Sequence, residues 1–297
     1  MSTLVSPQAP TAEPAARSAK DYRSGLDPIW CPGCGDFGVL AAVSEVMAAH
    51  GMDPDEIVVV SGIGCSSRFP AFLKCYGFHS VHGRALPVAT GVALANPRLK
   101  VLVVGGDGDG LSIGAGHFPH ACRRNINLTY LMLDNEIYGL TKGQVSPTTT
   151  DLSLAKKALT TPFGTWEEPL NAVGLALSYG ASFVARAYSA QRKEMAKVID
   201  QALVHRGFSF VHVVSPCTTF YNSYKTMTPR IKMIDDDHNV HDRRGALTLA
   251  YDPGAVWLGL FYRNADQPTL DDRFQHMRDV ARGDRQPQLT DVFRRYM

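Results

Sequence analysis

The sequence predicts an α/β fold with a single, mostly parallel sheet flanked by helices. Two apolar runs, residues 101–104 and 128–133, have the length and β-branched content of buried strands. A helix-compatible segment lies between them, as in a β–α–β unit, and residues 56–64 and 208–214 repeat the strand pattern. Because the strands run parallel, their carboxyl ends meet at one edge of the sheet, where open α/β sheets bind ligands.

Composition narrows the class of protein. At 297 residues, with 45% hydrophobic and 20% charged residues, the chain has the make-up of a soluble enzyme. A net charge of +2 gives no argument for nucleic acid or membrane binding, and no apolar run reaches the roughly 18 residues that cross a bilayer. The N-terminus lacks the layout of a secretory signal, so we expect a cytoplasmic protein.

Three segments are expected along the chain. Residues 1–20, rich in Ala, Pro and Ser, have no apolar period and are predicted to be a flexible extension. Residues 21–235 carry the strand pattern and are predicted to form the main domain. Residues 236–297 are expected to be an irregular, partly helical extension that packs on the domain or on a partner.

Helices are predicted from apolar spacing. Residues 37–47 repeat apolar side chains at helical intervals, and residues 85–95 are a run of small residues. Residues 189–205 read as an amphipathic helix with Ser189 as N-cap and Gly207 as the stop signal. After Gln144 a long polar stretch predicts a functional loop or a partner surface.

Polar residues follow two of the predicted strands. Asp107 ends the first run and Asn135 the second, with 26 residues between Gly108 and Asn135. A carboxylate, an amide oxygen and a backbone carbonyl, completed by phosphate oxygens and water, suit Mg²⁺. Glycines at 105, 106, 108 and 110 are expected to let backbone N–H groups approach the phosphates. The alternative is two ordinary strand-end turns, which are rich in Gly, Asp and Asn.

The spacing of the six cysteines favours a metal centre over disulfides. Cys65 and Cys217 each follow a predicted strand and so reach the same sheet edge as Asp107. Cys31 and Cys34 form a CxxC turn before a helix, which suits a metal centre, a redox pair or a structural turn. One CxxC with two distant cysteines is unusual for zinc and reasonable for an iron–sulfur cluster. The remaining two, Cys75 and Cys122, are expected to pack in the core.

These motifs resemble a known family. The GDG sequence followed by Asn is similar to the thiamine diphosphate (ThDP) motif, which implies that Asp107, Asn135 and the carbonyl of Ile137 hold the metal. Together WCPGCG, GIGCSSRFP, HGRA, GDGDGLSIG, NEIYGLTKGQ and SPC resemble the β subunit of 2-oxoacid:ferredoxin oxidoreductases, nearest to the 2-oxoglutarate type. The matches run from about residue 22 to 225.

The resemblance implies both cofactors and partners. The four cysteines Cys31, Cys34, Cys65 and Cys217 are expected to bind one [4Fe–4S] cluster. ThDP, Mg²⁺ and coenzyme A (CoA) would support reversible oxidative decarboxylation of 2-oxoglutarate to succinyl-CoA and CO₂, with electrons passed to ferredoxin. An α subunit is expected to supply the pyrimidine-binding domain and its glutamate, in an αβ or (αβ)₂ assembly. Expected cofactor contacts are Gly64, Ser66, His82, Gly106, Asp107, Gly108, Asp109, Asn135, Ile137, Gly139, Leu140 and Thr141.

The expected catalytic residues are Arg68, His82, Leu140 and Lys142. Among them, Leu140 and Lys142 resemble the positions that shape the choice of 2-oxoacid in this family. Arg68 would bind the first carboxylate of the substrate and Lys142 the second, which favours 2-oxoglutarate over pyruvate. The alternatives are a pyruvate-specific or broad 2-oxoacid enzyme, a cluster-free ThDP decarboxylase, and a non-catalytic iron–sulfur or zinc module.

Overall fold

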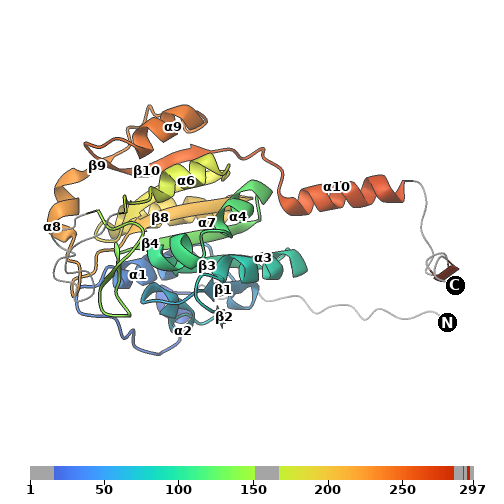
Figure 1. Ribbon diagram of the computed structural model, residues 1–297. Helices are drawn as coiled ribbons and strands as arrows, with labels where there is room; N and C mark the ends of the chain where they lie inside the picture. The colour runs from blue at the N-terminus through green and yellow to red at the C-terminus, as the bar shows by residue number, and fades with distance from the viewer. Residues whose placement is uncertain (1–16, 151–166, 284–289, 291–292, 295–297) are drawn as a thin grey trace.

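The computed structural model describes residues 17–150, 167–283, 290 and 293–294, and these form one layered α/β body (Figure 1). Its eight-stranded sheet has the order β2-β1-β3-β4-β8-β7-β10-β9, parallel except where β10 meets β7. The predicted fold class is therefore confirmed. The strands are β1 (Ile57–Ser61), β2 (Tyr76–His79), β3 (Lys100–Gly106), β4 (Leu128–Asp134), β7 (Phe183–Tyr188), β8 (Phe208–Val214), β9 (Ile231–Met233) and β10 (Val256–Arg263).

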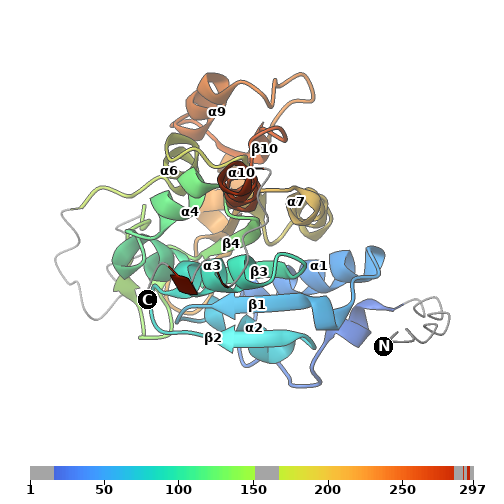
Figure 2. The ribbon, with the colours of Figure 1, turned by 90° about the vertical axis from the view of Figure 1, so that its right-hand side faces the viewer.

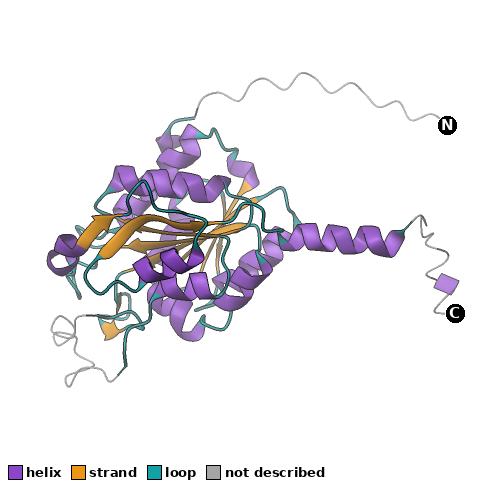
Figure 3. Cartoon of the chain, turned by 90° about the horizontal axis from the view of Figure 1, so that it is seen from above, coloured by secondary structure: helices purple, strands orange, loops and turns teal. Residues whose placement is uncertain are grey.

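Helices cover both faces of the sheet, as the view from above in Figure 3 shows. The α-helices are α1 (Asp36–Ala49), α2 (Phe69–Phe72), α3 (Ala85–Ala95), α4 (Phe118–Arg124), α6 (Ala172–Ser178), α7 (Arg192–Val204), α8 (Tyr224–Met227), α9 (Arg243–Ala250) and α10 (Leu270–Arg282). Short turns of other helix types are η1 (Ala19–Tyr22), η2 (Pro54–Glu56), η3 (Ser66–Arg68), η4 (Asp109–Ile113) and η5 (Thr228–Arg230). In the described part of the chain, no helix is both long and apolar enough to cross a membrane.

Alternate residues of the central strands point into two separate cores. On one face, Val103 and Tyr130 pack with residues of α3, α4, α6 and α9. On the other face, Val104 and Leu131 pack with residues of α1 and α7. Because both faces are covered, the central strands are continuous apolar runs, which is typical of parallel sheets.

Strand register brings the functional segments to one edge. Gly106 at the end of β3 lies opposite Leu133 of β4, and Asp134 at the end of β4 lies opposite Val214 of β8. The segments that follow these strands carry Asp107, Asn135 and Cys217, so they leave the sheet side by side.

The C-terminal segment differs from the expectation of an irregular extension. Strand β10 extends the sheet by pairing antiparallel with β7, and β9 pairs with β10, so the sheet continues well past residue 235. The alternation in β10 is interrupted by a register shift between Leu260 and Tyr262, which hides the strand pattern in the sequence. Helix α10 then leaves the body, as Figure 1 shows, and Figure 2 views this helix end-on.

Two further local features differ from the prediction. Helix α7 begins at Arg192 with Gln191 as N-cap, whereas Ser189 was expected there. Ser189 is buried, and its backbone N–H donates to the carbonyl of Val214, so it continues the hydrogen bonding between β7 and β8. A short hairpin of β5 (Ile137–Tyr138) and β6 (Gln144–Val145) also follows β4.

Candidate active site

The segments that follow β1, β3 and β4 enclose a cavity of about 360 Å³ at the carboxyl edge of the sheet. Asp107 and Asn135 both line this cavity, as the β–α–β pattern predicted. The other expected cofactor contacts also line it, namely Gly64, Ser66, His82, Gly106, Gly108, Asp109, Ile137, Gly139, Leu140 and Thr141. Ile63, Tyr138 and Gln144 line it as well, and no strand-end pattern singles them out.

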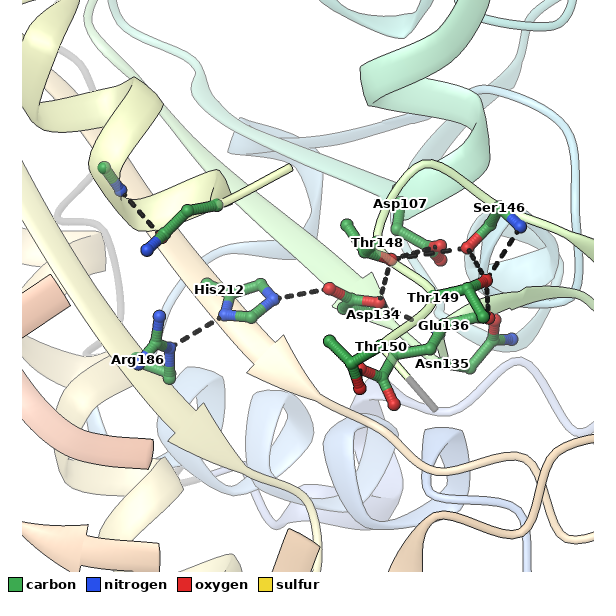
Figure 4. A network of polar contacts seen from close by, with 12 residues as sticks. Asp107, Asp134, Asn135, Glu136, Ser146, Thr148, Thr149, Thr150, Arg186 and His212 are labelled. Carbon is green, nitrogen blue, oxygen red and sulfur yellow. Dashed lines mark hydrogen bonds and ion pairs between the residues drawn. The ribbon is translucent and has the colours of Figure 1, made fainter. Parts of the chain in front are cut away.

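Asp107 is a buried carboxylate with a second carboxylate close by. The hydroxyl oxygen of Thr148 lies 2.8 Å from Asp107 Oδ2 and 2.8 Å from Asp134 Oδ1, between the two acids (Figure 4). Burial, followed by the negative charge of Asp134, raises the pKa of Asp107 to about 7. One hydroxyl carries one proton, so it can donate to only one of the acids at a time. A divalent cation at Asp107 would compensate the remaining charge.

Asn135 and Ile137 lie on a tight turn. Glu136 between them has a left-handed backbone with φ 58°, and the N–H of Ile137 donates to Asn135 Oδ1 at 3.1 Å. Within the described residues, no group of three or more His, Cys, Asp or Glu side chains is arranged to hold a metal ion. A Mg²⁺ ion here would therefore depend on amide, carbonyl and phosphate oxygens beside Asp107, which is the donor set Mg²⁺ prefers when it binds a diphosphate.

Among the glycines at 105, 106, 108 and 110, three also have packing roles that the sequence pattern did not predict. A Cβ atom on Gly108 would lie 2.3 Å from the Tyr138 ring, and one on Gly110 would lie 2.2 Å from the Tyr130 hydroxyl. A Cβ on Gly105 would lie 3.1 Å from an oxygen of Asp109. At these three positions glycine is needed for packing against side chains. At Gly106 the nearest atom to such a Cβ is Ser66 Oγ at 3.4 Å, so no close side-chain contact requires glycine there, and room beside the backbone remains.

Asp109 uses its carboxylate to hold two loops together. Its Oδ1 accepts hydrogen bonds from the N–H of Ile63 at 2.9 Å and from the N–H of Gly83 at 2.7 Å. The same oxygen lies 2.9 Å from His82 Nδ1, which makes Nδ1 the donor and leaves Nε2 available as an acceptor. Asp109 is only 4% exposed. It therefore positions His82 and its loop, a role that the expected cofactor contact did not include.

The residues expected to read the substrate lie on the rim. Leu140, which is 45% exposed, lines the active-site cavity and also a neighbouring cavity of about 480 Å³. Arg68 lines the neighbouring cavity and not the first. Lys142 is exposed, has φ 80° and lines neither cavity. Thr141 forms a short hydrogen bond with Gln144, which closes the turn between β5 and β6.

Two of the four cysteines of the expected cluster, Cys65 and Cys217, lie near Gly139. A Cβ atom on Gly139 would lie 3.4 Å from Cys65 Sγ and 4.0 Å from Cys217 Sγ. Cys31 and Cys217 both add to the rise in pKa of the Cys65 thiol to about 11, although burial is the largest cause and Asp36 the second. Burial likewise raises the pKa of Cys34, with Cys217 and Cys65 among the smaller causes. The four thiols are therefore close enough to affect one another.

Hydrogen bonds fix the CxxC turn against the segment of Cys217. The N–H of Gly35 donates to the carbonyl of Pro216 at 3.3 Å, and Thr218 Oγ1 donates to the carbonyl of Pro32 at 2.9 Å. None of the six cysteines is in a disulfide. Cys122 is buried in α4, and Cys75 is half-buried against the core, in agreement with the packing roles predicted for them.

Two family models match the chain in sequence. Residues 62–213 match the thiamine pyrophosphate enzyme C-terminal TPP-binding domain. Residues 217–279 match the C-terminal region of the pyruvate ferredoxin oxidoreductase β subunit. The first match covers the residues that line the cavity and the strands β2 to β4, but begins just after β1, and the second covers β9, β10 and most of α10.

Individual proteins are similar over most of the chain. The β subunit of 2-oxoacid:ferredoxin oxidoreductase 1 from Aeropyrum pernix is 38% identical over 94% of this chain and 92% of its own. The 2-oxoglutarate oxidoreductase subunit KorB of Mycobacterium tuberculosis is 48% identical over 69% of this chain and 54% of its own. The fold is also similar to a solved structure of 2-oxoglutarate:ferredoxin oxidoreductase from Magnetococcus marinus, which has 2-oxoglutarate, coenzyme A and succinyl-CoA bound. The two superpose with a TM-score of 0.89 at 42% sequence identity, over 94% of this chain and 96% of that one.

Proposed function

This chain belongs to the β subunits of the 2-oxoacid:ferredoxin oxidoreductases, and we propose that it carries the ThDP and a [4Fe–4S] cluster of a 2-oxoglutarate enzyme. One observation carries the proposal: the cavity lined by buried Asp107 also contains Gly139, beside which the sulfurs of Cys65 and Cys217 lie. When bound, ThDP supplies the carbon nucleophile for oxidative decarboxylation, CoA takes the succinyl group, and the cluster passes single electrons to ferredoxin.

In this proposal Asp107 and Asn135 are the side-chain ligands of Mg²⁺, and the carbonyl of Ile137 is the third protein ligand. The buried, uncompensated charge of Asp107 supports this assignment. The Thr148 hydroxyl lies within hydrogen-bond distance of Asp107 Oδ2, at 2.8 Å. The diphosphate is expected to contact Gly64, Ser66, Gly106, Gly108, Gly139 and Thr141, all of which line the cavity.

His82 is proposed to orient the bound cofactor or substrate. Its Nδ1 donates to Asp109, so Nε2 is free to accept a proton or a hydrogen bond. Asp109 does not touch the ligand in this arrangement. Its role is to keep the imidazole in one tautomer and to hold the loop after β1 against the turn before α3.

The cluster is proposed to bind through Cys31, Cys34, Cys65 and Cys217. The hydrogen bonds between the CxxC turn and the segment of Cys217 support this set, because they bring residues from the two ends of the domain together. The N–H of Phe220 also donates to Cys217 Sγ at 3.4 Å. Hydrogen bonds of this kind stabilise a thiolate and raise the reduction potential of a cluster that it binds.

Substrate selection is assigned to Arg68, Leu140 and Lys142. Arg68 and Leu140 line the neighbouring cavity, which suits a second carboxylate-binding region beside the cofactor. Lys142 lies outside both cavities, so its role requires the side chain to turn toward the bound substrate. Lys142→Ala should raise the KM for 2-oxoglutarate more than the KM for pyruvate in the assembled enzyme. An equal rise for both substrates would remove Lys142 from substrate selection.

The partners follow from what the cavity lacks. No glutamate is among the residues that line the described cavity, whereas ThDP needs one at its aminopyrimidine ring. We assign that glutamate to an α subunit, in an αβ or (αβ)₂ enzyme that reduces ferredoxin. A cytoplasmic location agrees with six cysteines that form no disulfides.

The deciding experiment is anaerobic purification of the chain with its α subunit, followed by assays of iron, sulfide and ThDP on one sample. Four irons, four sulfides and one ThDP per β chain are expected. ThDP without iron would indicate a cluster-free decarboxylase, and metal without ThDP a non-catalytic module. Turnover with a panel of 2-oxoacids then separates a 2-oxoglutarate enzyme from a pyruvate or broad-range one. Full turnover by the β chain alone would contradict the assignment of the glutamate.

A further inference from the structure

A second cavity of about 290 Å³ lies behind the active site and shares none of its lining residues. The carboxyl ends of β4 and β8 form one side of it, and α6, α8, α9 and the start of β10 form the rest. Its apolar walls include Leu170, Val214, Met227 and Val256. Two ionisable side chains in the lining, Glu136 at one corner and Arg186 at the other, distinguish this cavity from a packing defect.

The first corner is Glu136, which is 4% exposed. Its Oε1 accepts a hydrogen bond from Thr150 Oγ1 at 2.7 Å, whereas Oε2 is buried and has no hydrogen-bond partner among the residues that the structure describes. Burial, followed by the charge of Asp134, raises the pKa of Glu136 to about 8, so the ionised form is costly there without a donor. A cationic donor on a ligand would stabilise that ionised form at the unpaired oxygen.

Neighbouring Asp134 cannot help to bind a cation at this corner. Its Oδ1 accepts from Thr148 and from the backbone N–H of Glu136, and its Oδ2 from His212 Nε2 at 2.8 Å. One free oxygen, on Glu136, remains. That is too few for a metal ion and fits a single ammonium or hydroxyl group.

The second corner is Arg186, which is 8% exposed and makes no ion pair with any described carboxylate. Its Nε donates to His212 Nδ1 at 3.0 Å and Nη1 to the carbonyl of Trp257 at 3.4 Å. Because Nδ1 accepts from Arg186, His212 carries its proton on Nε2 and is neutral. A buried guanidinium without a counter-ion, lining a cavity, calls for an anion.

The two corners are separated. In Figure 4 the side chains of His212 and Asp134 lie between Arg186 and Glu136. An α-amino acid, whose two charges are one carbon apart, is too short to reach past an imidazole and a carboxylate. The ligand must be elongated, with its charges at opposite ends and an apolar chain between them.

We propose that this cavity binds an elongated ω-amino acid. Its carboxylate would pair with Arg186, with Arg230 at the cavity lining adding positive charge. Its ammonium group would donate to Glu136 Oε2, and its methylene chain would lie against Met227 and Val256. Such a ligand is not a 2-oxoacid, so the site is distinct from the active site in chemistry as well as in position.

The test uses the αβ enzyme saturated with Mg²⁺ and ThDP, so that the active site is filled. Binding of 6-aminohexanoate, hexanoate and hexylamine is measured by calorimetry. We expect 6-aminohexanoate to bind once per β chain, and each one-ended analogue to bind at least about tenfold more weakly. Equal binding of hexanoate or hexylamine, or no binding of 6-aminohexanoate up to about 10 mM, would overturn the proposal.

Variants assign the two ends. Arg186→Met should weaken the binding of 6-aminohexanoate at least about tenfold and leave the binding of hexylamine unchanged. Glu136→Gln should weaken the binding of 6-aminohexanoate without affecting the binding of hexanoate. Arg98→Met, at an exposed arginine after α3, is the matched control. Arg230→Gln changes an exposed residue and tests the anionic end if Arg186→Met fails to fold. ThDP affinity, measured on the same samples, separates failure of this site from failure of the proposed function. Binding of 6-aminohexanoate that survives both arginine changes would contradict the assignment.

Discussion

Replacing Asp109 by Asn tests how the active-site loops are held together. The change keeps the shape of the side chain and one acceptor oxygen, removes the charge, and replaces the second oxygen by an NH2 group. Three donors meet Oδ1: the N–H groups of Ile63 and Gly83, and Nδ1 of His82. Because two of these donors are backbone groups of different loops, the charge of Asp109 is what draws the loops together.

The size of the effect follows from the hydrogen bonds. A hydrogen bond to a charged acceptor contributes about 1.5–3 kcal/mol, and one to a neutral acceptor about 0.5–1.5 kcal/mol. Each hydrogen bond to residue 109 is therefore expected to lose about 1 kcal/mol when Asp is replaced by Asn. The His82 side chain is 40% exposed, so we count only the two backbone bonds in full. The sum is about 2 kcal/mol, or roughly 30-fold in affinity for a ligand that requires both loops in place.

The assay is a titration of ThDP at saturating Mg²⁺ into the αβ enzyme, followed by calorimetry. Asp109→Asn is expected to bind ThDP about 30-fold more weakly than wild type. The matched control is Asp55→Asn, which removes an exposed carboxylate far from the cavity lining. If Asp109→Asn bound ThDP with unchanged affinity, the inferred role of its charge would be wrong.

Three further changes test other parts of the structure. Thr148→Val removes the hydroxyl between Asp107 and Asp134. In urea titrations this change should lower the free energy of unfolding by about 2 kcal/mol without Mg²⁺, and by less with Mg²⁺ and ThDP. An equal loss in both conditions would argue against a cation at Asp107. Gly139→Ala places a methyl group beside Cys65 and Cys217 and should at least halve the iron content, whereas Gly116→Ala, in open space, should not. Unchanged iron would show that the cluster lies elsewhere. Burial, followed by the charge of Arg263, lowers the pKa of His205 to about 4. As the pH is lowered, the histidine of the unfolded chain, with a pKa of about 6.5, takes up a proton before the folded one does. The free energy of unfolding should therefore fall between about pH 6.5 and 4. At pH 5 the expected loss is about 1–2 kcal/mol, after allowance for the partial exposure of the side chain. His205→Gln should remove that loss, and an unchanged pH profile would refute it.

Strands buried on both faces were predictable because burial makes them continuous apolar runs. β3, β4 and β8 match the predicted runs closely, and their order placed Asp107, Asn135 and Cys217 at one edge. β2 gave no such signal, since all four of its residues are exposed. Neither did β10, in which the register shifts.

Side-chain direction was harder to predict than position. The sequence places Asp109 two residues after Asp107, yet Asp107 serves the cavity and Asp109 the loops behind it. Gly108 and Gly110 depend on Tyr138 and Tyr130, which approach from later strands. Such packing depends on contacts between distant segments, and local spacing does not contain that information.

The contact between Thr218 and Pro32 joins positions 186 residues apart and sets the timing of maturation. At about 5–20 residues per second, a ribosome needs roughly 10–40 s after making Cys31 and Cys34 before it makes Cys217. During that interval Cys31, Cys34 and the later Cys65 lack Cys217, the last of the four thiols to be made. If the proposed cluster is held by these cysteines, its complete loading would have to follow synthesis of β8, and the nascent chain would have to stay reduced until then.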